Sequence, residues 1–276
     1  MKLKKTLNIL ILLIFTGVLS ATLTTSDAKA KPKRKQAFDR GLIVYAPTSL
    51  TNVLHQILKE FSIKENISVS SSFDSSLSLE EKVEEGLPVN VFITEDNFIM
   101  KDLQQKGLIN VYSFSQIASD KLVIVAPKGN YMIKKLAKYD TTKDKLRFIS
   151  EKRLLVVPDI QTEKSGKLTQ KIFEEAGLWE KMKKSLITVA NSREALYLAS
   201  NGENLAVVYA SDAASESSVE VVVDMPELFN DKIIYQAVIV ADLGNTGSNQ
   251  DAQRFIDFLR SETSKKILKS HGLKPI

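Results

Sequence analysis

Residues 42–61 read LIVYAPTSLTNVLHQILKEF, and this stretch indicates the fold more clearly than any other. The run before Pro47 is apolar and β-favouring, as in a buried strand. Apolar side chains then recur at helical spacing as far as Phe61, so we expect a helix that begins near Thr48 or Ser49. A strand that passes through a polar turn into a helix is the repeating unit of an α/β sheet.

The expected first turn of this helix carries hydroxyl groups and no acidic side chain. Thr48, Ser49 and Thr51 supply the hydroxyls. The unpaired backbone N–H groups of a helix start and the positive end of the helix dipole would add to them, and together these groups suit an anion. A Ser or Thr at a helix start also serves as an ordinary N-cap, so the stretch by itself leaves both interpretations open.

The size and composition of the chain fit a folded protein with a substantial core. It has 276 residues, of which 43% are hydrophobic, and it shows no internal repeat. Such a chain is long enough for one large domain or for two lobes, and its composition excludes a disordered protein.

The first residues have the pattern of a secretory signal. Three lysines precede an apolar run over residues 9–19, and Ala28-Lys29-Ala30 supplies an A-x-A cleavage pattern. The alternative, a membrane anchor, needs about 20 apolar residues, whereas this run is followed by a Ser/Thr-rich stretch. We therefore expect residues 1–30 to be a signal peptide.

The basic character of the chain is concentrated at its amino terminus. Loss of residues 1–30, with four lysines and one aspartate, lowers the formal net charge from +5 to +2. Residues 31–40, KPKRKQAFDR, form a basic linker. A nucleic-acid partner has little support, because the Lys/Arg cluster is a leader and its tail. Cysteine is absent, which excludes disulfides, thiolate metal sites and a lipid-bearing cysteine, so we expect a soluble, monomeric periplasmic protein.

Strand, polar turn and helix recur along the chain. The strand at 67–73, ISVSSSF, leads into a hydroxyl-rich turn in which Ser78 and Glu81 are spaced as a capping box for a helix over 79–85. Further strands are expected at 89–94, 121–126, 154–157, 186–189, 205–209 and 233–241. Further helices are expected at 96–105, 168–176, 193–199, 250–259 and 264–269. Ligands of such sheets bind beyond the carboxyl ends of the strands, where this chain places small polar residues.

Taken together, several stretches resemble one family, the periplasmic molybdate-binding proteins that serve ABC importers. The resemblance extends from Gly41 to Pro275. It is carried by YAPTSLTNVL, SSFDSSLSLEEKVEEGLPVNVFITED, KLVIVAPKGN, SGKLTQKIFEEAGLW, NSREALYLASNGENLAVVYASDA and FIDFLRSETSKKILKSHGL. The order and spacing of these stretches are more specific than any one of them.

The resemblance implies a two-lobe α/β fold, the type II periplasmic-binding-protein fold. Each lobe would be a mixed sheet flanked by helices, with the ligand in the cleft between lobes that two crossing segments join. On that pattern the first lobe takes residues 41–127 and 235–276, and the second takes residues 128–234. The implied function is capture of molybdate or tungstate and delivery to the permease of an ABC importer. It implies no enzyme activity, no cofactor and no metal-cation ligands, since molybdenum is bound only as molybdate.

The resemblance also implies which residues bind the oxyanion. Its neutral donors match Ser49 and Ser76 in the first lobe and Ser165, Ser192 and Tyr209 in the second. Ser165 and Ser192 would act mainly through main-chain N–H groups. Tyr209 would donate its phenolic O–H from the end of a strand.

This chain departs from the family pattern at several positions. Pro47, Thr48 and Asp74 stand where small apolar residues are usual, Lys164 replaces a proline, and Asn90 replaces an aspartate. Asp74 and Lys164 could pair across the cleft, or Asp74 could point to solvent. These departures bear on the identity of the anion more than on the fold.

Rival functions have weaker support. A secreted serine hydrolase would need a base, but the only histidines are His55 and His271, no G-x-S-x-G elbow is present, and Lys164-Ser165 lies in no supporting motif. TEKSGK lacks the leading glycine of a phosphate loop, and the clustered ligands of a metal-cation binder are missing. A carrier for another oxyanion or a small organic anion remains open.

Overall fold

The computed structural model describes residues 41–152, 155–202, 204–226, 232–241 and 249–276. By its internal contacts the chain divides into residues 1–36 and residues 37–276, and all described residues belong to the second unit. The expected signal peptide and basic linker lie outside the described residues. Within the described ranges, no helix combines the length and the apolar character needed to cross a bilayer.

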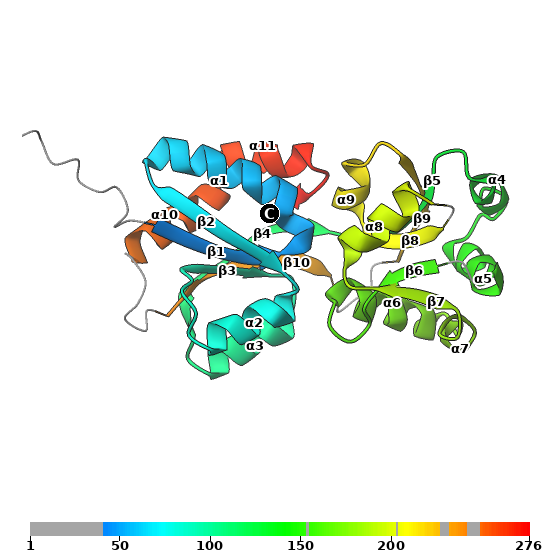
Figure 1. The fold of residues 1–276 in the computed structure, drawn as a ribbon, viewed down its shortest axis with the longest axis horizontal. Helices are drawn as coiled ribbons and strands as arrows, with labels where there is room; N and C mark the ends of the chain where they lie inside the picture. Colours follow the sequence, from blue (N-terminus) through cyan, green and yellow to red (C-terminus); the bar gives the residue numbers. More distant parts are fainter. Residues whose placement is uncertain (1–40, 153–154, 203, 227–231, 242–248) are drawn as a thin grey trace, which may run out of the picture. The chain divides into compact units, whose positions relative to one another are not determined.

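Two mixed sheets organise the described residues (Figure 1). The six-stranded sheet has the order β11-β4-β10-β3-β1-β2 and the five-stranded sheet has the order β7-β6-β8-β5-β9. The strands of the first are β1 Gly41–Pro47, β2 Ser68–Asp74, β3 Val91–Thr94, β4 Ile109–Asp120, β10 Ile233–Val240 and β11 Lys274–Pro275. Those of the second are β5 Leu122–Pro127, β6 Leu155–Pro158, β7 Leu186–Val189, β8 Leu205–Tyr209 and β9 Val219–Asp224.

Helices flank both sheets. They are the 3-10 helix η1 Thr48–Leu50, α1 Thr51–Glu65, α2 Ser76–Glu84, α3 Asn97–Gln105, α4 Tyr131–Leu136, α5 Thr142–Lys152, α6 Lys164–Glu175, α7 Trp179–Met182, α8 Ser192–Ser200, α9 Ala210–Ala214, α10 Asn249–Leu259 and α11 Glu262–Ser270. We call the six-stranded sheet with η1, α1–α3, α10 and α11 the first lobe. The five-stranded sheet with α4–α9 is the second lobe. The expected architecture, mixed sheets flanked by helices, is confirmed.

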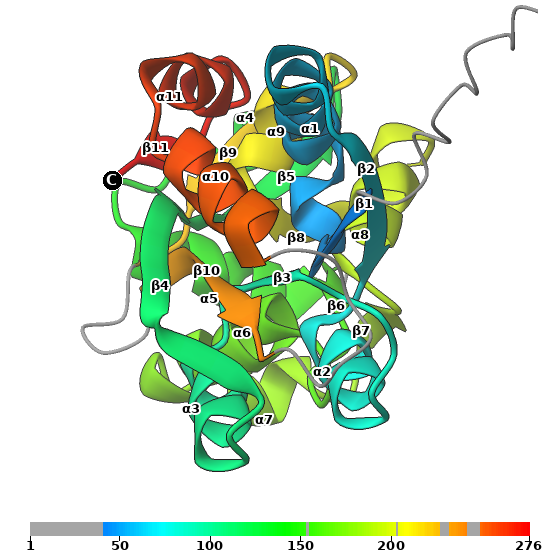
Figure 2. The same cartoon turned by 90° about the vertical axis from the view of Figure 1, so that its left-hand side faces the viewer.

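Alternation along the strands explains the layers of the first lobe. Leu42 and Val44 of β1 belong to the apolar cluster that includes the buried face of α1, whereas Tyr45 belongs to the cluster that includes α2 and α3. Side chains two residues apart on a strand share a face, so β1 is covered on both sides. Figure 2 shows α1, α10 and α11 on one face of the sheet and α2 and α3 on the other.

The second lobe is layered in the same way. Val123 and Val125 of β5 pack with α8, while Ile124 and Ala126 join the cluster that includes α4 and α6. All four side chains are buried, which is the pattern of a central strand.

The position of β5 differs from the expected boundary between the lobes, which was placed after residue 127. We expected residues 41–127 in the first lobe, but β5 hydrogen-bonds β8 on one side and β9 on the other, so it belongs to the five-stranded sheet. The chain therefore crosses between the sheets after Asp120. A strand buried on both faces needs partners and helices on both sides, and the second lobe supplies them.

Other differences concern elements with weak apolar periodicity. Residues 127–153 gave no expected element but contain α4 and α5. β4 was also missed, because most of its side chains before Ile117 are exposed. α2 begins at Ser76, capped by the Ser75 side chain, so the capping box expected at Ser78 is wrong.

Candidate functional site

The site residues of the first lobe lie where its parallel strands end. β1 pairs in parallel with both β2 and β3, so the carboxyl ends of these strands meet at one edge of the sheet. Ser49 lies in η1 after β1, and Ser76 opens α2 after β2. Glu95 follows β3 directly.

The second lobe repeats this arrangement. β6 pairs in parallel with β7 and β8. Ser165 lies in the first turn of α6 after β6, Ser192 opens α8 after β7, and Tyr209 ends β8. All five residues expected to bind the oxyanion are buried, and each is no more than 8% exposed.

Ser49 is held by the last long strand of its own sheet. Its hydroxyl accepts a hydrogen bond from Tyr235 of β10, with 2.9 Å between the two oxygens. The neighbouring Thr51 hydroxyl donates to the Thr48 carbonyl at 2.7 Å and so caps the turn. At this helix start the Thr51 hydroxyl therefore stabilises the turn, whereas the Ser49 hydroxyl contacts Tyr235.

Ser76 and Tyr209 converge on the carboxylate of Glu95. Ser76 Oγ donates to Glu95 Oε2 at 3.2 Å, and the Tyr209 hydroxyl donates to Glu95 Oε1 at 3.0 Å. Thr94 Oγ1 donates in turn to Ser76 Oγ at 3.0 Å. Two expected anion donors, one from each lobe, thus already hold an acidic group between them.

Ser192 is joined to this network through Tyr209. Its hydroxyl accepts from the Tyr209 backbone N–H at 3.3 Å and donates to Asp212 Oδ2 at 3.2 Å. Arg193 Nε lies 3.0 Å from Asp212 Oδ1, which makes an ion pair. The Nε–H group of Arg193 makes no hydrogen bond among the described residues, so the contact with Asp212 is an ion pair without one. The Ser192 side chain is thus engaged within the second lobe, which leaves its backbone as the expected donor.

Ser165 stands apart from these hydrogen bonds. It is fully buried, and its Oγ has no hydrogen-bond partner among the described residues. The next residue, Gly166, packs so closely on the end of β6 that a Cβ would lie 2.2 Å from the carbonyl oxygen of Asp159. The first turn of α6 is therefore pressed against the strand end, where its N–H groups have no partner within the helix.

Three buried carboxyls, Glu95, Glu163 and Asp212, and the half-buried Asp120 have raised pKa values in this region. Burial is the main cause that raises the pKa of Glu95 above its usual value, against the lowering effect of the hydrogen bonds from Tyr209 and Ser76. Burial, then Glu95, raises the pKa of Glu163 to about 8. Burial likewise raises the pKa of Asp120 to about 7 and that of Asp212 to about 6, the latter despite Arg193.

Glu95 is the site residue that the sequence analysis missed. It follows the strand at 89–94 and precedes an expected helix, as the hydroxyl-rich turns that contain Ser49 and Ser76 also do. The signal available in the sequence was an acidic residue directly after a strand whose carboxyl end lies at the same sheet edge as those of β1 and β2. Its contact with Tyr209, 114 residues later in the chain, has no local trace in the sequence.

The positions that depart from the family pattern have local partners. Asp74 accepts hydrogen bonds from Lys82 Nζ and from Ser78 Oγ, each at 2.9 Å, and its expected pairing with Lys164 stays a prediction. Asn90 is buried and its Oδ1 accepts from the backbone N–H of Ile43 at 2.8 Å, which ties β3 to β1.

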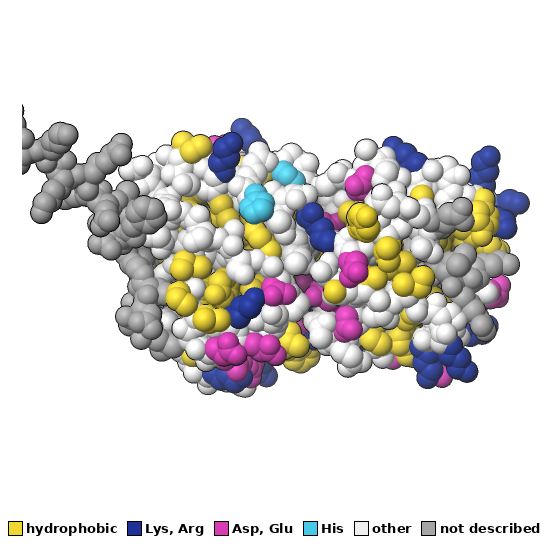
Figure 3. All heavy atoms as spheres, viewed as in Figure 1, with side chains coloured by type: hydrophobic (Ala, Val, Ile, Leu, Met, Phe, Trp, Pro, Cys, Tyr) yellow, Lys and Arg dark blue, Asp and Glu magenta, His cyan; other side chains and the backbone are white. Residues whose placement is uncertain are grey.

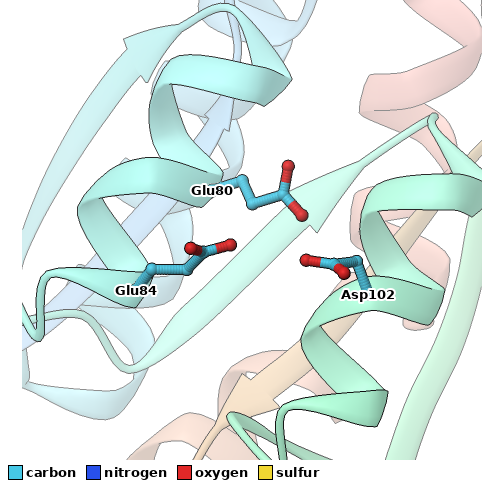
Figure 4. Close-up of side chains that lie close together, drawn as sticks. All are labelled: Glu80, Glu84 and Asp102. Atoms are coloured by element: carbon cyan, nitrogen blue, oxygen red, sulfur yellow. The ribbon is translucent and has the colours of Figure 1, made fainter.

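A pocket of about 790 Å³ opens beside the network, between α2, α3 and α6. Its wall includes Asp96 and Lys164, the sequence neighbours of Glu95 and Ser165. Glu80, Glu84 and Asp102 point toward one another in the same wall (Figure 4), and acidic side chains gather over these helices in Figure 3. Lys106 lies 2.6 Å from Glu84 and 2.5 Å from Asp102, so this acidic cluster carries its own counter-charge.

Comparison with known proteins adds independent findings. A family model described as Bacterial extracellular solute-binding protein matches residues 42–274. The chain is 29% identical to the molybdate-binding protein ModA of Escherichia coli (strain K12), over 85% of this chain and 89% of that protein. It resembles the structure of the periplasmic molybdate-binding protein of Azotobacter vinelandii with a TM-score of 0.68 and 21% identity, over 84% and 98% of the two chains.

The fold is also shared with a binder of a different anion. The sulfate-binding protein SubI of Mycobacterium tuberculosis H37Rv matches with a TM-score of 0.67 and 15% identity, over 86% of this chain and 87% of that chain. Likeness at these identities speaks for the fold alone.

Proposed function

Because the chain belongs to the family of bacterial extracellular solute-binding proteins, we propose that it captures a tetrahedral oxyanion, molybdate or tungstate, and delivers it to the permease of an ABC importer. The ligand assignment draws on the similarity to the molybdate-binding protein of Escherichia coli over most of both chains. One structural observation carries it: hydroxyls from both lobes converge on the two oxygens of a single carboxylate. Hydroxyl groups that donate to the two oxygens of a carboxylate can also donate to the oxygens of a bound oxyanion.

The proposed donors are the five residues named from the sequence. Ser49, Ser76 and Tyr209 would donate side-chain hydroxyls, whereas Ser165 and Ser192 would donate main-chain N–H groups at the starts of α6 and α8. Helix starts stabilise anions through their unpaired N–H groups and the helix dipole. Neutral donors from two sheets would enclose the anion without a metal cation or a cofactor.

The proposal is of a binding protein without enzyme activity, exported through residues 1–30. Mass spectrometry of the mature protein tests the export route. The expected mass is that of a chain beginning at Lys31 with no lipid attached, as the sequence has no cysteine to carry one. Incubation with a chromogenic ester tests the absence of hydrolase activity, and sedimentation tests the proposed monomer.

Thermal unfolding with a panel of anions tests the ligand. We expect molybdate and tungstate to raise the melting temperature, because a ligand at a hundred times its dissociation constant adds about 2.7 kcal/mol of stability. Sulfate is a smaller tetrahedron, so donors placed for the larger anions should bond it poorly. Equal stabilisation by sulfate, or stabilisation by phosphate or an organic anion alone, contradicts the assignment.

A further inference from the structure

Glu95 occupies the point where donors from the two lobes meet. Its side chain is buried, and its two oxygens accept from Ser76 and Tyr209. Both hydroxyls are proposed anion donors, so carboxylate and ligand compete for the same hydrogen atoms. The function of Glu95 must therefore be compatible with an anion bound at these donors.

An ionised Glu95 would oppose a dianion at this place. A carboxylate only accepts hydrogen bonds, so it would set acceptor oxygens against the acceptor oxygens of molybdate. Like charges a few ångströms apart in a buried setting also repel strongly. Two cations of this region are engaged by aspartates among the described residues: Arg193 pairs with Asp212, and Lys167 is 3.9 Å from Asp96.

We propose that Glu95 is a further ligand-binding residue of the oxyanion site, which enters the complex as a carboxylic acid, so that each dianion is bound together with one proton from solution. This inference rests on the proposed function. The proton adds to one carboxylate oxygen of Glu95, and the resulting O–H donates to an oxygen of the anion. Ser76 and Tyr209 turn their hydroxyls from Glu95 to the anion, and no bond of the anion breaks.

The surroundings of Glu95 favour this protonation. Asp96 on the same turn and Glu163 at the start of α6 are acidic, while Tyr209 of β8 and Tyr235 of β10 are buried phenols. The Ser76 hydroxyl is the contact from α2. Burial already raises the pKa of Glu95 in the free protein, and the charge of a bound dianion would raise it further.

Glu163 is a second buried glutamate near the site, and it provides the control. Burial, then the charge of Glu95, raises the pKa of Glu163 to about 8. Its Oε1 has no hydrogen-bond partner among the described residues, in contrast to both oxygens of Glu95. An anion bound at Ser76 and Tyr209 should therefore act on Glu95 first.

Titration calorimetry tests the proton count directly. Molybdate is titrated into the full-length mature protein in two buffers of different ionisation enthalpy, over a series of pH values. We expect uptake of about one proton per anion between the pKa of Glu95 in the free protein and its higher pKa in the complex. Over that window the dissociation constant should rise about tenfold per pH unit, since one proton is bound with the ligand. Glu95→Gln should bind molybdate with no proton uptake and little dependence on pH.

Glu163→Gln is the matched variant and should keep the proton uptake. Uptake that persists in Glu95→Gln, or that disappears in Glu163→Gln instead, overturns the assignment to Glu95. The wild-type proton count needs no variant, so zero uptake overturns the inference even if Glu95→Gln fails to fold. In that case molybdate still binds and the proposed function stands. Absence of any heat with molybdate and tungstate contradicts the proposed function itself, and the inference falls with it.

Discussion

At the scale of single residues, Tyr209 links the two lobes through one oxygen atom. Its hydroxyl reaches Glu95 at the end of β3, and its ring centroid lies 6.4 Å from that of Tyr235 in β10. Its backbone N–H holds Ser192 in its own lobe. Deleting the hydroxyl alone therefore separates its role as a donor from its role in packing.

Tyr209→Phe should fold and should bind molybdate more weakly. A hydrogen bond to a charged group contributes about 1.5–3 kcal/mol, which corresponds to a loss of affinity of about ten- to a hundredfold. Calorimetry measures the change. Tyr45→Phe is the matched control, because Tyr45 is a buried tyrosine in the cluster that includes α2 and α3. Equal affinities of Tyr209→Phe and wild type would leave Tyr209 as a packing residue.

The residues that the sequence predicted and the one it missed differ in what defines them. Ser49 and Ser76 lie in hydroxyl-rich helix starts, which are a local pattern, and the family resemblance singled them out within those turns. Glu95 also follows a strand, but its importance comes from Ser76 and Tyr209, which reach it through space. A single sequence carries no signal for contacts of that kind.

At the scale of elements, α6 is placed by a close approach of two backbones. The first turn of this helix would bring main-chain N–H groups to the anion, and Gly166 lets it pack on the end of β6. A Cβ at Gly166 would meet the carbonyl oxygens of Asp159 and Pro158 at 2.2 Å and 2.5 Å. Backbone atoms of this kind cannot move aside as a flexible side chain could.

Gly166→Ala should therefore displace the start of α6. We expect a loss of about 1–3 kcal/mol of stability, the usual cost of overpacking, together with weaker molybdate binding. Chemical denaturation and calorimetry measure the two effects. Gly41→Ala is the control, since a Cβ there has no neighbour within 4 Å. A stable Gly166→Ala variant with full affinity would show that the position of this turn is unimportant.

Elements were predictable where apolar periodicity is strong. α8, α10, β1, β3, β6 and β8 have buried side chains with clear spacing, and their expected ranges agree with the structure to within a few residues. α4 and α5 lie in a lysine-rich stretch where charges mask the pattern. β4 has three consecutive exposed side chains near its start, so its alternation is too irregular to identify a strand.

At the scale of the whole molecule, the division between sheets depends on pairing that the sequence does not display. β5 follows β4 after a single residue, yet it pairs with β8 and β9 in the other sheet. Apolar side chains of both lobes also form one continuous cluster, which includes Tyr209 and Tyr235. The network around Glu95 lies beside this shared core, so its ionisation affects the stability of the fold.

The buried carboxyls predict that stability falls as pH rises. Glu163 has a pKa of about 8 in the folded protein against 4.5 for an ordinary glutamate, so the folded state holds its proton more tightly than the unfolded state. Its contribution to stability is therefore lost progressively between about pH 4.5 and pH 8. Glu163→Gln keeps the neutral form, so it should melt several degrees above wild type near pH 9, at about 2–4 °C per kcal/mol, and close to wild type near pH 4.5. Glu60→Gln, on the exposed side of α1, controls for the loss of one charge. A difference in melting temperature that does not change with pH would contradict this role for Glu163.

Glu95 should also hold the ligand-free lobes together, because it lies in the first lobe with Ser76 and accepts a hydrogen bond from Tyr209 of the second lobe. Glu95→Ala removes both hydrogen bonds and leaves Ser76 and Tyr209 without their shared partner. We expect the ligand-free variant to have a larger radius of gyration by solution scattering than the ligand-free wild-type protein. Saturating molybdate should remove the difference, since the anion bridges the same two donors. Glu95→Gln, which keeps an acceptor oxygen, should give a smaller increase. Identical scattering of all three ligand-free proteins would mean that other contacts fix the lobes and that Glu95 serves only the bound anion.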